Sequence, residues 1–189
     1  GSGTWGMALA RMLSNCGHSV TVWSAHPEKA EQLASSRVLK NLPGMIIPDE
    51  IAFTSVAEEI CRDKDIILFS VASVYVRSTA ETIAPYVKEG QLIADVAKGI
   101  EPGTLLTMTG VIADALKKPV KLVALSGPTH AEEVAKDLPT TIISACEDLA
   151  AAEYVQDVFM NTCMRVYTST DIMGVEFCGA MKNIIALAA

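Results

Sequence analysis

The sequence predicts an α/β fold in which a doubly wound, mostly parallel sheet carries helices on both faces. Three observations support this class. Short apolar segments alternate with helix-like segments along the whole chain, a pattern that favours right-handed crossovers between parallel strands. The apolar run within residues 65–71 is typical of a strand covered on both faces. The opening residues, Gly-Ser-Gly-Thr-Trp-Gly, match the G-x-G-x-x-G fingerprint of a tight turn that enters a helix.

The elements follow in order from apolar runs, helical periodicity and turn residues. We expect strands at residues 20–23, 51–54, 65–71, 91–96, 120–125, 140–144 and 164–168. We expect helices at residues 7–15, 28–36, 56–61, 74–87, 105–117, 131–136, 149–160 and 171–189. A buried strand normally precedes the fingerprint and none does here, so the predicted sheet is Rossmann-like and lacks its first strand.

The domain organisation is predicted from the last helix, which is apolar on more than one face and has no Gly or Pro stop signal. Such a helix is expected to begin a truncated all-helical second domain. The expected organisation is a dinucleotide-binding domain over residues 1–169 and the first helix of the substrate domain over residues 170–189. The linker-like opening Gly-Ser-Gly could instead be a cloning remnant, but the Trp5-Gly6 pair and the strand that follows favour the fingerprint.

Composition narrows the classes of partner and compartment. A net charge of −7 argues against nucleic acid, whose phosphates would be repelled. No apolar run is long enough to span a membrane, so membrane insertion is not expected. The five cysteines form no Cys-x-x-Cys pair, which favours reduced thiols and a cytoplasmic location. The three histidines lack the spacing of metal ligands, so no metal site is expected.

The glycine-rich turn predicts that a pyrophosphate binds at the start of the chain. Gly1 permits the tight turn, Gly3 lets the backbone approach the anion, and Gly6 allows close packing of the helix. The free N–H groups and the positive end of the helix dipole would attract the phosphates.

The segment after the strand at 20–23 bears on cofactor selectivity. It reads Ser24-Ala25-His26 and has no Asp or Glu, which NAD-selective folds usually place here to bind the ribose 2′-hydroxyl. One interpretation is tolerance of a 2′-phosphate, assisted by His26, Lys29 or Arg37, and the other is sequence drift in a loop. We therefore expect NAD(P)H as the cofactor, with NADP slightly favoured.

Two loops follow predicted strands at the carboxyl end of the sheet, where the ligand-binding crevice of a doubly wound fold lies. In one, Lys98 stands before a glycine and could pair with an anionic substrate or be a solvated loop residue. In the other, Thr129 and Glu132 have capping-box spacing, and Gly127 and Thr129 could also present polar groups to the crevice. His130 could be a general acid, although a surface histidine near a cap is the commoner case.

The segment 174–183 places a lysine inside an apolar helix. Burying the Lys182 ammonium is costly unless it has a partner or a task. Gly179 and Asn183 lie one turn apart on one face, with Glu176 a further turn back. Lys182 could be a general acid or base, or it could extend its ammonium to solvent at a domain interface.

Together these motifs resemble NAD(P)-dependent glycerol-3-phosphate dehydrogenase of the bacterial type. The resemblance rests on the fingerprint, on Ala97-Lys98-Gly99, on residues 125–135, and on Gly174-Val175-Glu176 with residues 179–183. It implies a cytoplasmic enzyme that interconverts dihydroxyacetone phosphate and sn-glycerol 3-phosphate for phospholipid synthesis, with a homodimer as a possible assembly. Lys182 would be the proton acceptor in alcohol oxidation, and Lys98 would touch both cofactor and substrate.

The resemblance extends to individual positions. The cofactor-binding residues it implies are Gly1, Gly3, Thr4, Trp5, Gly6, Ala25, His26, Lys98 and Ala131. The substrate-binding residues are Lys98, Gly127, Thr129, Lys182 and Asn183.

Two departures from the family pattern matter. Cys178 stands where the family usually has a second glycine, and the helical domain that supplies an Asp partner for the lysine and an Arg for the substrate phosphate is not in this sequence. The fragment is expected to be poorly active.

Two alternative functions remain. A β-hydroxyacid dehydrogenase also carries a lysine on its interdomain helix, but Ser126-Gly127-Pro128-Thr129 replaces its glycine-rich substrate loop. A non-catalytic dinucleotide sensor would need neither lysine.

Overall fold

The structure is a computed structural model that describes residues 1–188, except the side chains of residues 183, 185 and 186. The strands are β1 (Thr21–Trp23), β2 (Ala52–Thr54), β3 (Ile66–Phe69), β4 (Leu92–Asp95), β5 (Lys121–Ser126), β6 (Thr140–Ala145) and β7 (Met164–Ser169). The helices are α1 (Thr4–Asn15), α2 (Pro27–Ser36), α3 (Val76–Ile83), α4 (Met108–Leu116), α5 (Ala131–Val134), α6 (Leu149–Met160) and α7 (Ile172–Ala188), with a 3-10 turn η1 (Ser73–Tyr75) before α3.

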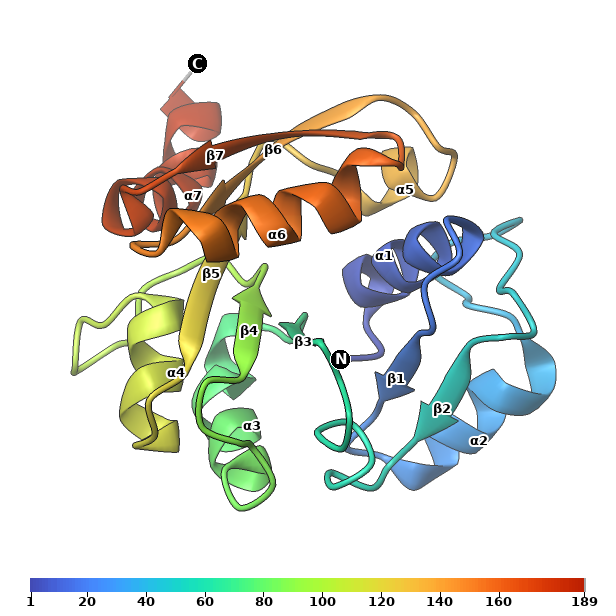
Figure 1. Ribbon diagram of the computed structural model, residues 1–189. Coiled ribbons are helices and arrows are strands. Elements are labelled where there is room, and N and C mark those ends of the chain that lie inside the picture. Colours follow the sequence, from blue (N-terminus) through green and yellow to red (C-terminus); the bar gives the residue numbers. More distant parts are fainter. Residues whose placement is uncertain (189) are drawn as a thin grey trace.

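The strands form two groups (Figure 1). β3 to β7 make one sheet in that order, and β1 pairs with β2 beside it. All neighbours are parallel except β5 and β6, which are antiparallel. Because Phe69 pairs with Asp95 and Asp95 with Ala124, the carboxyl ends of β3, β4 and β5 lie at one edge. The predicted α/β class with a mostly parallel sheet is confirmed.

Helices cover both faces of the sheet because side chains alternate along each strand. Ile67 and Ile93 belong to a core completed by α3 and α4, whereas Leu92 and Ala94 belong to a second core completed by α1 and α6. The buried α3 and α4 residues in the first core are Val76, Ala80, Ile83, Met108, Val111, Ile112 and Leu116. Those of α1 and α6 in the second include Met7, Leu9, Met12, Val155 and Phe159. The doubly wound arrangement is therefore confirmed.

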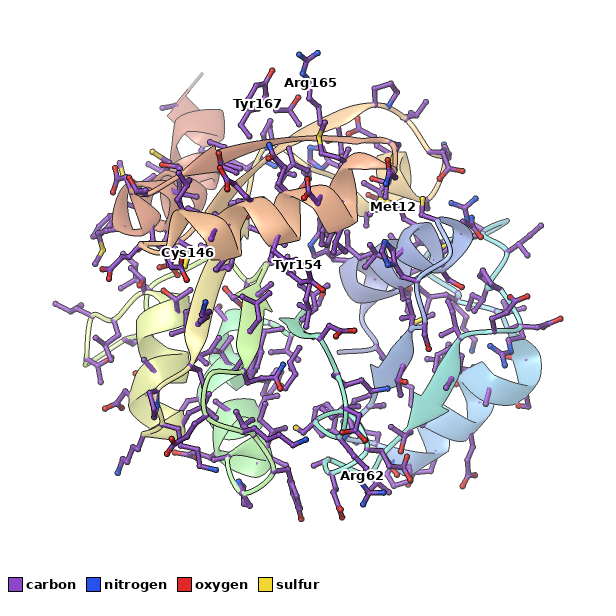
Figure 2. The ribbon with its side chains drawn as sticks, viewed as in Figure 1. Met12, Arg62, Cys146, Tyr154, Arg165 and Tyr167 are labelled. Carbon is purple, nitrogen blue, oxygen red and sulfur yellow. The ribbon has the colours of Figure 1, made fainter. Side chains whose placement is uncertain are left out.

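β1 and β3 are not paired with each other, and a cavity of about 350 Å³ lies between them. Residues of both strands line it together with α1 and α6, and Tyr154 of α6 is among them (Figure 2). Within residues 1–188 no strand occupies this position, as expected for a doubly wound sheet without its first strand.

Several expected helices differ from the observed ones. The helix expected over residues 56–61 is wrong, because the backbone N–H groups of Cys61 and Arg62 both reach the Glu58 carbonyl and the segment forms turns only. A segment this short cannot offset the cost of helix nucleation. The helix over residues 74–87 begins as η1 and ends at Ile83, just before Pro85. No helix among residues 1–188 has the length and apolar character needed to cross a membrane.

Candidate functional site

The glycine fingerprint forms the turn that leads into α1. A Cβ added to Gly6 would lie 2.2 Å from the Gly1 carbonyl oxygen, and one added to Gly1 would lie 2.2 Å from the Ser70 carbonyl oxygen. Glycine is required at both positions because the turn packs backbone to backbone against the end of β3. A Cβ on Gly3 would meet nothing within 4 Å, so this residue faces open space. The three glycines thus have the close-packing and open positions that the fingerprint requires.

A cavity of about 230 Å³ lies at this turn. Its lining comes from the fingerprint, from residues 70–72 after β3 and from Val96 after β4. Gly3 caps α1 without a side-chain hydrogen bond, so the first N–H groups of the helix are available to an anion. Thr4 and Trp5 lie in the same lining. These features fit the phosphate portion of a dinucleotide.

The segment after β1 carries no carboxylate. Ser24 is buried, and its Oγ accepts a hydrogen bond from the His26 backbone N–H at 3.2 Å. Ala25 and His26 are exposed, and His26 is the N-cap of α2. The segment after β1 thus presents an imidazole and the N-terminus of α2, and the first acidic side chain is Glu28 in the first turn of that helix.

Arg37 does not lie free for a 2′-phosphate, which corrects the expectation for this residue. Its guanidinium donates hydrogen bonds to the carbonyl oxygens of Pro48, Asp49 and Ile51, and it stacks over the Phe53 ring at 5.2 Å. These contacts hold the loop before β2. Sequence alone could not detect them, because the partners are backbone oxygens.

Lys98 lies in the loop after β4, three residues beyond Asp95. Its Nζ donates a hydrogen bond to the Gly127 carbonyl oxygen, 2.8 Å away in the loop after the adjacent strand β5. Burial, and after it the charge of Lys182, lower the pKa of the Lys98 ammonium. The two lysines are therefore close enough for their charges to interact.

Helix α7 approaches the sheet at Gly179. A Cβ there would lie 2.5 Å from Ser126 Oγ and 3.7 Å from Lys98 Cγ, so the missing side chain allows the helix to reach β5 and Lys98. Lys182 follows three residues later and is partly buried. Lys98 and Gly127 thus lie together next to α7, and the charge of Lys182 on that helix acts on Lys98. A shared site for Lys182 and Lys98 stays a prediction. The Asn183 side chain lies outside the described residues.

The segment after Gly127 differs from the prediction. The Thr129 N–H bonds to the Gly127 carbonyl at 2.9 Å, and His130, not Thr129, is the N-cap of α5, with no side-chain capping bond. The predicted capping box is therefore wrong, because the tight turn at Gly127 delays the helix by one residue. Thr129 remains partly buried, whereas His130 is exposed. Ala131 packs partly against the core that contains α1.

Two polar residues near the carboxyl ends of the parallel strands were not identified from sequence. Asp95 ends β4 with only 2% of its surface exposed, and its Oδ1 accepts the Ala97 N–H at 3.2 Å. Thr109, in the first turn of α4, binds the Glu176 carboxylate. A lone Asp after an apolar strand was a signal for the first, but nothing in the pattern connects Thr109 with Glu176. Among residues 1–188 no three His, Cys, Asp or Glu side chains cluster as a metal site would require.

Comparisons with known proteins agree with this arrangement. A family profile described as NAD-dependent glycerol-3-phosphate dehydrogenase N-terminus matches residues 1–152. The chain is 67% identical to glycerol-3-phosphate dehydrogenase [NAD(P)+] 2 of Lactobacillus delbrueckii subsp. bulgaricus, with 100% of this chain and 58% of that protein covered. It is 48% identical to glycerol-3-phosphate dehydrogenase [NAD(P)+] of Agathobacter rectalis, with 100% of this chain and 56% of that protein covered.

Solved structures show the same fold. The crystal structure of glycerol-3-phosphate dehydrogenase from Coxiella burnetii superposes with a TM-score of 0.91 at 30% identity, covering 100% of this chain and 57% of that one. The chain thus spans little more than half the length of these relatives. The profile match over residues 1–152, together with the fingerprint turn at its start, shows that the chain belongs to the NAD-dependent glycerol-3-phosphate dehydrogenase family, in its N-terminal part.

Proposed function

We propose that the protein is an NAD(P)-dependent oxidoreductase that interconverts dihydroxyacetone phosphate and sn-glycerol 3-phosphate, with Lys182 as general acid and base. The observation that supports this proposal is the position of Lys98 at the carboxyl edge of the sheet, where its ammonium binds the Gly127 carbonyl and senses the charge of Lys182. Val96, which lines the cavity at the fingerprint, precedes Lys98 by two residues. The lysines therefore lie within reach of a substrate held beside a dinucleotide.

The chemistry follows from the two ammonium groups. When bound, the reduced nicotinamide supplies a hydride to the carbonyl carbon of the ketone. Lys182 donates a proton to the ketone oxygen as negative charge develops there, and accepts it back when the alcohol is oxidised. Lys98 stabilises that charge and the substrate phosphate without transferring a proton. The Gly127 carbonyl orients the Lys98 ammonium, and Thr129 offers a hydroxyl to the substrate.

The relatives support the substrate class, since they are named glycerol-3-phosphate dehydrogenases [NAD(P)+]. The proposal divides the chain into a dinucleotide-binding domain over residues 1–169 and the first helix of a substrate domain over residues 170–189. That second domain would supply an Asp partner for Lys182 and an Arg for the phosphate. A cytoplasmic homodimer that feeds phospholipid synthesis completes the proposal, and light scattering of the full-length protein tests the dimer.

The proposal includes use of NADPH as well as NADH. It is supported by the absence of a carboxylate in residues 24–27 and by exposed His26. Changing His26 and Lys29 to Ala should lower kcat/KM for NADPH several-fold and leave that for NADH nearly unchanged. Equal losses with both cofactors would contradict a role in reading the 2′-phosphate.

The main experiment follows NADPH oxidation by the full-length enzyme with dihydroxyacetone phosphate. Lys182→Ala should abolish turnover and leave NADPH affinity nearly intact, whereas Lys98→Ala should raise KM and lower kcat together. The control is Lys88→Ala, which removes an exposed lysine at the opposite edge of the sheet, paired with Asp63. Equal loss of turnover and NADPH affinity in Lys182→Ala would mean that this lysine is structural. Wild-type enzyme that reduces a β-hydroxyacid precursor instead would replace the proposed substrate.

A further inference from the structure

Helix α7 is attached to α4 through a buried carboxylate. Glu176 is 8% exposed, and its Oε1 accepts a hydrogen bond from the Thr109 backbone N–H at 2.9 Å. Its Oε2 accepts a second one from Thr109 Oγ1 at 2.5 Å. A buried carboxylate that accepts two hydrogen bonds has a fixed position, because losing either bond would leave a desolvated acceptor unsatisfied.

The N-terminus of α4 has a backbone N–H group with no partner in its own helix, and this carboxylate binds it. Thr107 is the N-cap of α4 but makes no side-chain capping bond. The free N–H of Thr109, two residues later, is therefore bound by Glu176 of another helix. The carboxylate also lies at the positive end of the α4 dipole, where negative charge is stabilised.

Asp95 is a second buried carboxyl group close to Glu176. Burial, and also the nearby charge of Glu176, raise the pKa of the Asp95 carboxyl well above its usual value, although its hydrogen bond from the Ala97 N–H opposes the shift.

We propose that Glu176 is a positioning residue for Lys182: its contact with Thr109 fixes α7 so that the lysine ammonium reaches the site beside Lys98. This inference rests on the proposed function. Glu176, Gly179 and Lys182 follow one another at intervals of three residues, so successive members lie about one turn apart. Gly179 provides the second anchor through its fit against Ser126 and Lys98.

The expected effect follows from the geometry of the helix. Six residues separate Glu176 from Lys182, which is roughly 9 Å along the axis. A tilt of about 10° at the first anchor would displace the lysine by about 1.6 Å over that length. Because a misplacement of about 1 Å can cost about 100-fold in rate, loss of the contact should lower kcat by roughly 10- to 100-fold.

The test uses the full-length enzyme and four variants: Glu176→Gln, Thr109→Val, their double variant, and Thr109→Ser as the conservative control. Glu176→Gln should lower kcat by roughly 10- to 100-fold with the Kd for NADPH within about two-fold of wild type. Thr109→Val should lower kcat in the same direction, Thr109→Ser should retain it, and the double variant should be no worse than Glu176→Gln. Glu153→Gln, on the exposed side of α6, controls for the loss of one carboxylate.

A second readout is independent of turnover and of general stability. If Lys182 moves away, its charge no longer lowers the pKa of Lys98. The NMR titration of reductively ¹³C-methylated Lys98, assigned with Lys98→Arg, should then shift to higher pH in Glu176→Gln. The alkaline limb of kcat should shift in the same direction.

Two results overturn the inference: wild-type kcat and an unchanged Lys98 titration in Glu176→Gln, or equal losses of kcat and NADPH affinity. The proposed function fails separately, when wild-type enzyme does not reduce dihydroxyacetone phosphate. In that case the Lys98 titration alone decides whether Glu176 positions Lys182. If Glu176→Gln does not fold, the milder Thr109→Val and Thr109→Ser pair gives the same comparison.

Discussion

The buried carboxyl group of Asp95 should make the stability of this protein depend on pH in a direction opposite to that of an ordinary ion-paired acid. Burial raises the pKa of Asp95 above its usual value of 3.8. The folded protein therefore holds a proton that the unfolded chain has released. Since the unfolded state binds fewer protons, the free energy of unfolding falls as pH rises between the two pKa values.

The magnitude is set by this proton difference. One bound proton contributes about 1.4 kcal/mol for each pH unit between 3.8 and the folded pKa. Asp95→Asn removes the titration, while an amide oxygen can still accept the Ala97 N–H. The variant should therefore gain stability relative to wild type by about 1.4 kcal/mol per pH unit above pH 4, until the folded pKa is reached.

Urea unfolding of wild type and Asp95→Asn at half-unit intervals from pH 4 to pH 8 measures this difference. The other ionisable groups titrate in both proteins, so the difference between the two curves isolates Asp95. Asp49→Asn, at an exposed position, is the matched control for replacing one carboxyl group by an amide. A flat difference for Asp95→Asn would refute the reasoning, because it would mean that the buried carboxyl is charged in the folded state.

Three further predictions test the core and the site. Phe159→Ala, which truncates a side chain only 1% exposed, should lower the free energy of unfolding by about 3–5 kcal/mol, and a loss below about 1 kcal/mol in urea titrations would mean that the core collapses around the change. Gly6→Ala should cost about 1–3 kcal/mol of stability because the new Cβ meets a backbone oxygen. Gly3→Ala should keep the thermal midpoint and weaken NADPH binding, and equal midpoints for the two glycine variants would contradict the packing argument. Arg77 lowers the pKa of Glu101 to about 2, so the stability difference between wild type and Glu101→Gln should be full above pH 4.5 and disappear as pH falls towards 2 in unfolding curves.

The sequence by itself determined the class of fold and most of its elements. Helix α6 was predicted with both its ends, since its apolar positions and flanking polar residues are local signals. The strands were predicted to within about two residues for the same reason. Lys98 and Lys182 were proposed from sequence as site residues, because a charged residue within an apolar helix or directly after an apolar strand is costly and therefore conspicuous.

Only the tertiary structure decided how these pieces meet. The antiparallel pairing of β5 with β6 depends on the path of the loop between them, which no local pattern encodes. Arg37 was misjudged because its partners are backbone oxygens of a distant loop. The contact between Glu176 and Thr109 joins residues 67 positions apart, and a hydrogen bond of this kind leaves no periodic signal in the chain. Local propensities shaped the helices and strands, whereas the contacts between distant loops and helices depended on backbone packing and on hydrogen bonds such as that of Glu176 with Thr109.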